Sequence, residues 1–206
     1  MKKSFLFYLL ISLIPFVFFS QSIDSIDYIS PFSDSLAAIE KQQKWAFINT
    51  EGKIVINFRD DLVKSNFKDG NYPVFKNNRC LIFKEIEGIK YYGFIDETGK
   101  TIIKPQFLNA TNFNKNKAIA LNVIKDTIGN NSVLKKAIVR YGYTEVIINP
   151  NGSIIHYLTL KPKSFTLSQK AIKELPQIKT KYISDNLIAI WTEDNTWKIK
   201  KLIDLQ

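Results

Sequence analysis

Histidine and cysteine are almost missing from this chain of 206 residues, which has one of each, His156 and Cys80. Imidazole and thiolate groups are the main protein ligands of zinc and copper, and a histidine is the base in most nucleophilic triads. One of each, far apart in the sequence, is a poor basis for either kind of site. We therefore expect no metal and no cofactor, and several enzyme classes are disfavoured.

A lone cysteine also cannot form a disulfide within the chain. Cys80 is then either a small buried side chain or a reactive thiol. It lies in the stretch RCLIF at 79–83, which is typical of a strand. This context favours burial.

Long apolar runs are absent after the N-terminus. The one such run, Phe5 to Phe19, follows a start with two lysines and precedes Ser20 and Ser22. This layout predicts a secretory signal peptide at residues 1–20, with cleavage after residue 22 as a variant. An uncleaved anchor helix is the alternative, but fifteen residues fall short of the roughly 17–25 that a spanning helix needs. We expect an exported protein, periplasmic, secreted or at the cell surface, with no transmembrane anchor after cleavage.

Acidic residues are fewer than basic ones, 19 against 29, and the net charge is +10. Removal of residues 1–20 takes away two lysines and no acid, which leaves +8. A basic protein favours anionic partners, which for an exported chain are envelope polymers or lipid head groups rather than nucleic acid. A compositional bias toward Lys, Asn, Ile and Phe along the whole chain accounts for the same positive charge. Anionic partners and compositional bias therefore both stay open as explanations.

Internal similarity is the main positive feature of the sequence. Three stretches share an apolar pair, Asn or Asp, two variable residues, glycine and a second apolar segment: 47–56, 94–103 and 147–156. Asn or Asp first and glycine fourth predict a hairpin turn in which the glycine has positive φ. The expected turn residues are Asn49 and Gly52, Asp96 and Gly99, and Asn149, Pro150 and Gly152.

A second unit recurs between these turns, at 32–39, 67–74, 113–120 and 183–190. Its fourth position holds Ser35, Gly70, Asn116 or Asn186, which suit a left-handed turn, and a strand pattern follows. The distance from the preceding glycine, 15 residues to position 67 and 14 to position 113, supports this alignment.

The remaining segments predict insertions and a connector. Residues 76–90 and 122–140 predict lengthened hairpins, with turns at 77–78, 87–88 and 129–131. Residues 161–181 contain Pro162 and Pro176 and predict a basic connector with a short helix near 168–175. The expected organisation is a repeat region at 21–160, this connector at 161–181, and a terminal partial repeat at 182–206.

The stretch YGFIDETGKTIIKPQF at 92–107, continued by Phe113 and Ala118, resembles the unit of the WG-repeat proteins of bacteria. KWAFIN at 44–49 is a second copy with Ala46 in place of the name-giving glycine, and a copy around Ile147 lacks both Trp and Gly. The resemblance covers most of 28–160 and extends to 182–206. It implies an exported or envelope-associated repeat array without an established enzymatic activity, and no functional residue is carried over.

The adjacent carboxylates Asp96 and Glu97 are the first chemical candidate. Catalysis by carboxylates needs two of them aimed at one substrate. The corresponding positions of the other repeats hold Asn49-Thr50 and Asn149-Pro150, which carry no carboxylate. We therefore interpret the pair as part of a turn.

Aromatic and basic side chains near the C-terminus are the second candidate. Trp191 and Trp197 flank a polar stretch typical of a hairpin turn, and residues 161–181 hold six lysines and one acid. Packing in the core and a solvated connector are the competing interpretations. The candidate ligand surface consists of Trp191, Trp197, Lys161, Lys163, Lys170 and Lys173.

Together these features predict an all-β protein of tandem antiparallel hairpin repeats, either an open array or propeller-like, after an N-terminal signal helix. The expected function is a non-catalytic binding or scaffold module of the cell envelope, with a protein or an envelope polymer as partner. Anion or glycan binding at the candidate surface is the alternative, and a carboxylate-based hydrolase is a further one.

Overall fold

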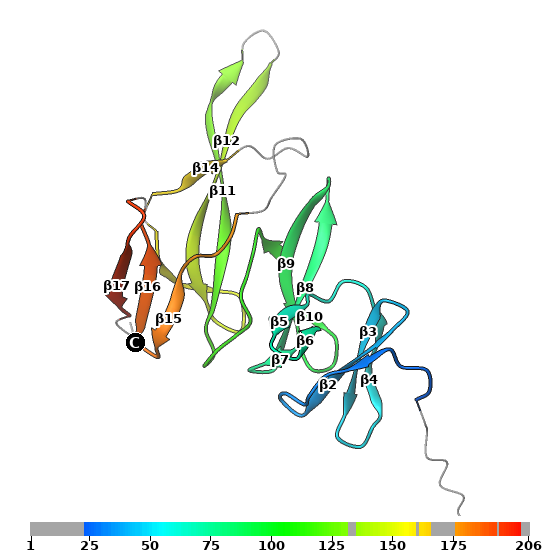
Figure 1. Ribbon diagram of the computed structural model, residues 1–206. Helices are drawn as coiled ribbons and strands as arrows, with labels where there is room; N and C mark the ends of the chain where they lie inside the picture. Colours follow the sequence, from blue (N-terminus) through cyan, green and yellow to red (C-terminus); the bar gives the residue numbers. More distant parts are fainter. Residues whose placement is uncertain (1–22, 132–134, 160, 166–175, 193, 203–206) are drawn as a thin grey trace, which may run out of the picture.

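The computed structural model describes residues 23–131, 135–159, 161–165, 176–192 and 194–202 (Figure 1). Within these ranges it contains strands and no helix. The expected signal peptide at 1–20 and the expected short helix at 168–175 lie outside the described residues. In the described ranges, no helix has the length and apolar character needed to cross a membrane.

The strands are β1 (Tyr28–Ile29), β2 (Leu36–Lys41), β3 (Lys44–Asn49), β4 (Ile54–Arg59), β5 (Ser65–Phe67), β6 (Gly70–Tyr72), β7 (Phe75–Lys76), β8 (Arg79–Ile86), β9 (Ile89–Ile95), β10 (Thr101–Phe107), β11 (Ala118–Asn131), β12 (Lys136–Ile148), β13 (Ile154–Tyr157), β14 (Lys163–Phe165), β15 (Lys181–Ser184), β16 (Leu187–Trp191) and β17 (Trp197–Lys201).

The strands form four antiparallel sheets that follow one another along the chain. The first sheet is β1-β2-β3-β4, the second β7-β8-β9-β10, the third β11-β12-β13 with β14 paired to β12, and the fourth β15-β16-β17. A separate hairpin, β5–β6, lies between the first and second sheets in the chain. Figure 1 shows the sheets side by side in chain order, from the first at the right to the fourth at the left.

The same strand register recurs in all four sheets. The equivalent cross-strand pairs are Ala37 with Ile48, Cys80 with Ile95, Ala118 with Ile148, and Ile188 with Lys200. Each pair lies in the hairpin formed by β2–β3, β8–β9, β11–β12 or β16–β17. Each sheet is therefore one copy of a repeat, and the fourth copy begins before residue 187.

Hydrophobic side chains alternate between the two faces of each inner sheet. In the second sheet, Cys80, Ile82 and Ile95 belong to the core shared with the first sheet. Leu81 and Phe94 belong to the core shared with the third sheet. The third sheet repeats this arrangement toward the second and fourth sheets. Because both faces are covered, the inner strands are nearly continuous apolar runs, as in other stacked repeats.

The array is open. Within the described residues, no strand pairing and no core cluster joins the first sheet to the fourth. The predicted all-β fold of antiparallel hairpins is thus confirmed, and of the two arrangements left open by the sequence the protein adopts the unclosed one.

Short turns precede the first hairpin strand of the first three repeats. They span residues 33–36, 76–79 and 114–117, and each has positive φ at both central residues. In the first and third of these turns, two backbone hydrogen bonds link the end residues. Such turns have a twist that matches the flanking strands.

The central residues of these turns contact the turn of the next repeat. Asn78 N donates to Asp34 Oδ2 at 2.9 Å, and Asn116 N donates to Asn77 Oδ1 at 3.0 Å. At the last boundary Lys115 Nζ forms an ion pair with Asp185 at 2.5 Å. The turns therefore form a continuous row that connects all four repeats.

The prediction that residues 67–74 are the second copy of this unit is wrong. Residues 75–82 have the two positive-φ residues, Asn77 and Asn78, and the strand register of the other copies. Residues 67–72 belong to the inserted β5–β6 hairpin, where Gly70 has a φ of +147°, and residues 73–74 connect it to β7. The distance from Gly52 to Phe67 resembled the distance from Gly99 to Phe113 in the third repeat, because the inserted hairpin also begins with a phenylalanine followed by a turn. In the fourth copy, Asn186 is not among the residues with positive φ.

Of the two predicted insertions, the lengthened hairpin at 122–140 is present with its turn misplaced, whereas residues 76–90 are not an insertion but the turn and β8–β9 hairpin of the repeat itself. β8–β9 turns at Glu87 and Gly88, both with positive φ. β11–β12 continues through residues 129–131, which lie in strand β11 and pair with residues 136–138. Figure 1 shows the distal part of this hairpin projecting from the stack as an arm.

Candidate functional site

Three turns, at 49–53, 96–100 and 149–153, have one geometry. In each, the glycine N donates to the carbonyl of the first residue, at 2.8–2.9 Å, and the glycine has a φ between +75° and +85°. The side chain of the first residue accepts hydrogen bonds from two backbone N–H groups ahead of it. The structure places Asn49, Gly52, Asp96, Gly99, Asn149, Pro150 and Gly152 in these turns.

One carboxylate oxygen of Asp96 is engaged by its own turn. Its Oδ1 accepts from Thr98 N at 2.9 Å, Thr98 Oγ1 at 2.6 Å and Lys100 N at 3.0 Å. Desolvation opposes its ionisation, but these hydrogen bonds and the charge of Arg79 outweigh it and hold the pKa of Asp96 below its usual value. Glu97 is exposed beside it. This arrangement is that of a turn, not of two carboxylates aimed at one substrate.

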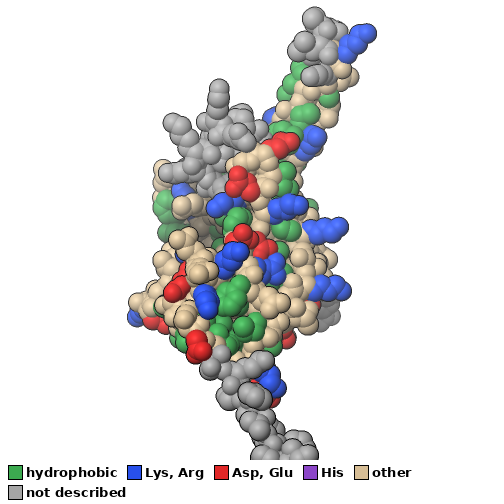
Figure 2. Space-filling model, turned by 90° about the vertical axis from the view of Figure 1, so that its right-hand side faces the viewer, with side chains coloured by type: hydrophobic (Ala, Val, Ile, Leu, Met, Phe, Trp, Pro, Cys, Tyr) green, Lys and Arg blue, Asp and Glu red, His purple; other side chains and the backbone are tan. Residues whose placement is uncertain are grey.

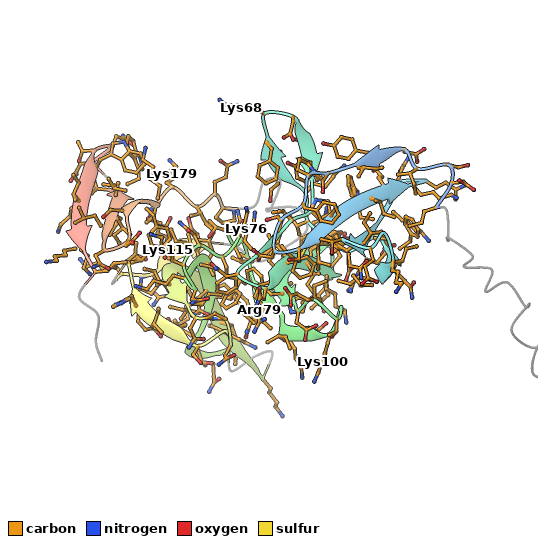
Figure 3. The ribbon with its side chains drawn as sticks, turned by 90° about the horizontal axis from the view of Figure 1, so that it is seen from below. Lys68, Lys76, Arg79, Lys100, Lys115 and Lys179 are labelled. Carbon is orange, nitrogen blue, oxygen red and sulfur yellow. The ribbon has the colours of Figure 1, made fainter. Side chains whose placement is uncertain are left out.

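Two arginines connect these turns to the preceding repeat. Arg59 donates from Nη1 to the Gly99 carbonyl at 3.3 Å, and Arg79 donates from Nε to the Pro150 carbonyl at 2.9 Å. Arg79 is labelled in Figure 3. Both arginines are half-buried, so their side chains are part of the packing between repeats and not a free basic surface.

Cys80 is fully buried in the core between the first and second sheets. Burial raises the pKa of its thiol well above the usual value. It occupies the position of Ala37 and Ala118 in the neighbouring repeats. The structure therefore agrees with a packed small side chain rather than a reactive thiol.

A small pocket lies where the third and fourth sheets meet. Its volume is about 150 Å³, and its lining combines an aromatic ring, two lysines, a carboxylate and neutral polar groups. The lining residues are Tyr143, Glu145, Thr159, Lys163, Gln177, Lys179 and Trp191. Of the candidate surface predicted from the sequence, the structure brings Trp191 and Lys163 together here.

Strand geometry explains why these side chains converge. Tyr143 and Glu145 are two positions apart on β12 and so point to the same face of the sheet. Lys163 on β14 is the direct partner of Tyr143. Trp191 ends β16, and the ammonium group of Lys179 lies 5.8 Å from the centre of its ring. Figure 3 shows Lys179 on the segment that leads into β15.

Glu145 is the buried charge of this pocket. Its carboxylate accepts hydrogen bonds from the Thr180 hydroxyl and from Lys179 N, and its own backbone N donates to Thr159 Oγ1 at 3.0 Å. Burial, and secondarily the charge of Glu145, raises the pKa of Tyr143, so its phenol stays protonated as a hydrogen-bond donor. Glu145 is the one carboxylate among the described lining residues.

The other predicted surface residues lie elsewhere. Trp197 is on the exposed face of β17, in edge-to-face contact with Trp191 at 4.9 Å between ring centres. Lys161 is exposed and does not line the pocket. Lys170 and Lys173 lie outside the described residues.

Sequence reasoning missed Lys179, Tyr143 and Glu145. Lys179 was in the basic segment but was not singled out. Tyr143 and Glu145 carry a weak sequence cue, the alternation of polar side chains on one face of a strand. Nothing in the sequence indicated that this face of β12 would meet the end of β16.

The fold and its internal contacts define a class, the tandem β-repeat proteins, in which each unit buries its apolar faces on its neighbours. The family model for the WG containing repeat matches three stretches of this chain, residues 26–45, 45–80 and 92–122. These three matches support the WG containing repeat family for residues 26–80 and 92–122. The third and fourth sheets beyond them keep the same strand register.

Comparison with other proteins adds little on function. No curated protein matches the chain. One solved structure, the crystal structure of the computationally designed Ika4 protein, aligns with 89% of this chain and 95% of its own at 12% identity. Its TM-score is 0.39, which is too low to support an argument about this fold.

Proposed function

We propose that this repeat protein is an exported, non-catalytic binding module of the cell envelope, with the Trp191 pocket as its ligand site. The observation that carries the proposal is the convergence of an indole ring, two ammonium groups and a buried carboxylate around one pocket. Aromatic faces with a few placed polar groups are the usual composition of sites that bind small polar ligands.

The chemistry of the pocket favours an anionic or hydroxyl-rich group. Lys163 and Lys179 supply positive charge, and Trp191 supplies a flat face on which a sugar ring can stack. Tyr143 and Glu145 supply a donor and an acceptor for hydroxyl groups. A volume of about 150 Å³ limits the bound group to a single ring or an acidic substituent of a larger polymer. An anionic glycan of the envelope fits these properties.

Catalysis by carboxylates is less well supported. A glycosidase needs two carboxyl groups on opposite sides of the scissile bond. In this pocket Glu145 already accepts hydrogen bonds from Thr180 and Lys179. The Asp96 carboxylate is engaged by its own turn. We therefore propose binding without turnover.

Binding of a sulfated or uronic-acid oligosaccharide to residues 21–206, followed by tryptophan fluorescence, tests the ligand class. Trp191→Ala and Lys163→Gln should each weaken binding at least about tenfold, as loss of a charged or stacking contact does. Lys161→Gln is the matched control, because this lysine is exposed in the same segment outside the pocket. Equal affinities in all four proteins would rule the pocket out as the site.

Export is tested separately, by fractionating cells that express the full chain with a C-terminal epitope. We expect the processed, shorter chain outside the cytoplasm. An unprocessed chain that stays in the cytoplasm would contradict the export part of the proposal and leave the ligand test unaffected.

A further inference from the structure

The row of turns is joined differently at its last boundary. At the first two boundaries, the first central residue of a turn, Asp34 or Asn77, accepts a hydrogen bond through its side-chain oxygen from the backbone N–H of the next turn. Lys115 holds this position in the third turn. An ammonium group has no acceptor, so the backbone of the fourth turn cannot be held in the same way.

The fourth turn, at residues 184–187, is closed like the other three but has another backbone conformation. Its end residues pair with each other, as the end residues of the earlier turns do. Its central residues Asp185 and Asn186 are not among the residues with positive φ. The third and fourth turns are joined instead by the ion pair of Lys115 with Asp185, whose side chains are both 65% exposed. Such an exposed pair contributes little to stability.

A cavity of about 450 Å³ lies between the third and fourth turns, and we call it the turn cavity. Its lining includes Lys115, Lys117, Tyr182, Asp185 and Asn186. It is separate from the Trp191 pocket, since no described residue lines both. Its volume falls within the range of roughly 300–1,000 Å³ that is usual for small-molecule sites. The boundary without the usual acceptor is thus also the boundary with room for a ligand.

The hydroxyl of Tyr182 is a buried donor without an acceptor. The ring packs against the core between the third and fourth sheets. Among the described residues, the hydroxyl has no hydrogen-bond partner. Burial raises the pKa of Tyr182 to about 12, so the phenol keeps its proton. Buried polar groups are nearly always paired in native proteins, so an acceptor is expected at this wall of the cavity.

The charges that line the turn cavity favour an acidic group. They are Lys115, Lys117 and Asp185, two bases and one acid. Basic and acidic side chains are mixed on the face of the molecule shown in Figure 2, so general attraction of anions to a basic surface does not define a site there. Binding of an anion therefore depends on donors placed around one point, and hydrogen bonds from such donors are strongest when the acceptor is charged.

We propose that the turn cavity binds an acidic group, a carboxylate or a phosphate, whose oxygen takes the acceptor place that Asp34 and Asn77 fill at the earlier boundaries. Lys115 then pairs with the ligand, and the Tyr182 hydroxyl and the backbone N–H of Asn186 donate to it. The site is independent of the ligand pocket of the proposed function.

Nuclear magnetic resonance of isotope-labelled residues 21–206, titrated with inorganic phosphate and separately with acetate, tests the proposal. We expect saturable shifts of the backbone amide signals of residues 114–117 and 182–187 with at least one of the two anions. Comparison of the two titrations shows which acidic group is preferred. Sodium chloride at the same ionic strength is the control, because salt alone screens the exposed ion pair. Absence of saturable shifts with both anions, or equal shifts with chloride, would overturn the proposal.

Two substitutions with opposite effects assign the shifts to this cavity. Lys115→Asn restores the amide acceptor found in the second turn and should weaken anion binding at least about tenfold. Asp185→Asn removes the carboxylate that competes for Lys115 and should strengthen binding. Lys76→Asn is the matched control, because this lysine is exposed in the second turn outside the cavity. Unchanged affinity in Lys115→Asn, or a change of the same sign in both variants, would exclude the site.

Tyr182→Phe tests the buried hydroxyl without removing the ring from the core. It should weaken anion binding about two- to tenfold, as loss of one hydrogen bond does. Far-ultraviolet circular dichroism confirms that each variant is folded. An affinity equal to that of the wild type would show that the hydroxyl does not contact the anion and would overturn its part in the site.

Discussion

Gly93 is the residue whose small size matters most to the second sheet. A Cβ at this position would lie 2.6 Å from Pro105 N and 2.8 Å from Lys104 C, and it would also meet the Ile103 carbonyl oxygen. These are backbone atoms of the neighbouring strand β10, which has a register shift between Ile103 and Phe107. The first sheet holds Ala46 at the same position, with its methyl group fully buried. The glycine of the repeat thus allows the close approach of two backbones.

Gly93→Ala should destabilise the fold by about 3 kcal/mol, because a clash with backbone atoms cannot be relieved by a rotamer change. Urea unfolding followed by tryptophan fluorescence measures the loss. Gly129→Ala is the control, since no heavy atom lies within 4 Å of a Cβ there and its φ is not positive. Equal stability of the two variants would contradict the close approach.

Asp96→Asn should keep the turn and reduce its dependence on pH. Asparagine retains the Oδ1 acceptor, as Asn49 and Asn149 show in the equivalent turns. The pKa of Asp96 is lowered in the folded protein, so its contribution is present above the unfolded pKa of about 3.9 and is lost as the pH falls through the folded value. The fall in melting temperature between pH 7 and pH 3 should therefore be smaller in Asp96→Asn than in the wild type. Glu97→Gln, which changes an exposed neighbour, should keep the wild-type fall.

At the scale of the elements, the first three sheets are joined to one another at three levels. Alternating side chains form the core between them, turn residues such as Asp34 and Asn77 accept hydrogen bonds from the next turn, and an arginine reaches the next glycine turn. Gly152 also allows close packing between sheets, since a Cβ at this position would lie 3.1 Å from the side chain of Ile103 in the preceding sheet. The repeat boundary is therefore specified by polar contacts at its edges and by apolar packing at its centre.

Arg79→Met should reduce stability by about 1–2 kcal/mol, because the Pro150 carbonyl loses a charged donor while the apolar stem is kept. Denaturant titration measures this change. Arg140→Met is the comparison, since the ion pair of Arg140 with Asp126 at 3.5 Å is solvent-exposed and contributes little. A loss no larger than that of Arg140→Met would show that the contact between Arg79 and the turn does not stabilise the boundary.

At the scale of the whole molecule, the structure is a linear stack, and in the described ranges strand pairing and core clusters join the strands of each sheet only to those of its neighbours. The core is divided accordingly, with a main cluster at each boundary and a smaller one around Ile89 and Leu121 that also joins the second and third sheets. Stability of such an array is close to a sum over units and boundaries, so damage at one end need not spread to the other. Within the described residues, the first and fourth sheets each share a core cluster with one neighbouring sheet only.

Ile188→Ala should loosen the fourth sheet and spare the first. Ile188 is fully buried at the boundary with the third sheet, and its truncation should cost about 2–5 kcal/mol locally. Hydrogen exchange should show lost protection in β15–β17 and unchanged protection in β2–β3. A uniform loss in all four sheets would indicate one cooperative unit instead of a linear array.

The sequence by itself determined the class of fold and the local turns. Short apolar strands between Asn or Asp and glycine encode hairpins locally, because positive φ at Gly52, Gly99 and Gly152 depends on a few neighbouring residues. The WG resemblance, carried by residues 92–107, identified the family for the same reason. The sequence failed where two segments looked alike, since residues 67–74 imitate the repeat that residues 75–82 form.

Tertiary structure alone decided which sheet lies on which, and therefore where the Trp191 pocket and the turn cavity are. Trp191, Lys163 and Glu145 come from three strands whose meeting depends on the stacking of the third and fourth sheets. The different exposure of Trp45 and Trp197, at the same position of their repeats, follows from a neighbour that one sheet has and the other lacks. Local patterns encode hydrogen bonds within a repeat, but the burial of a side chain depends on segments distant in the sequence.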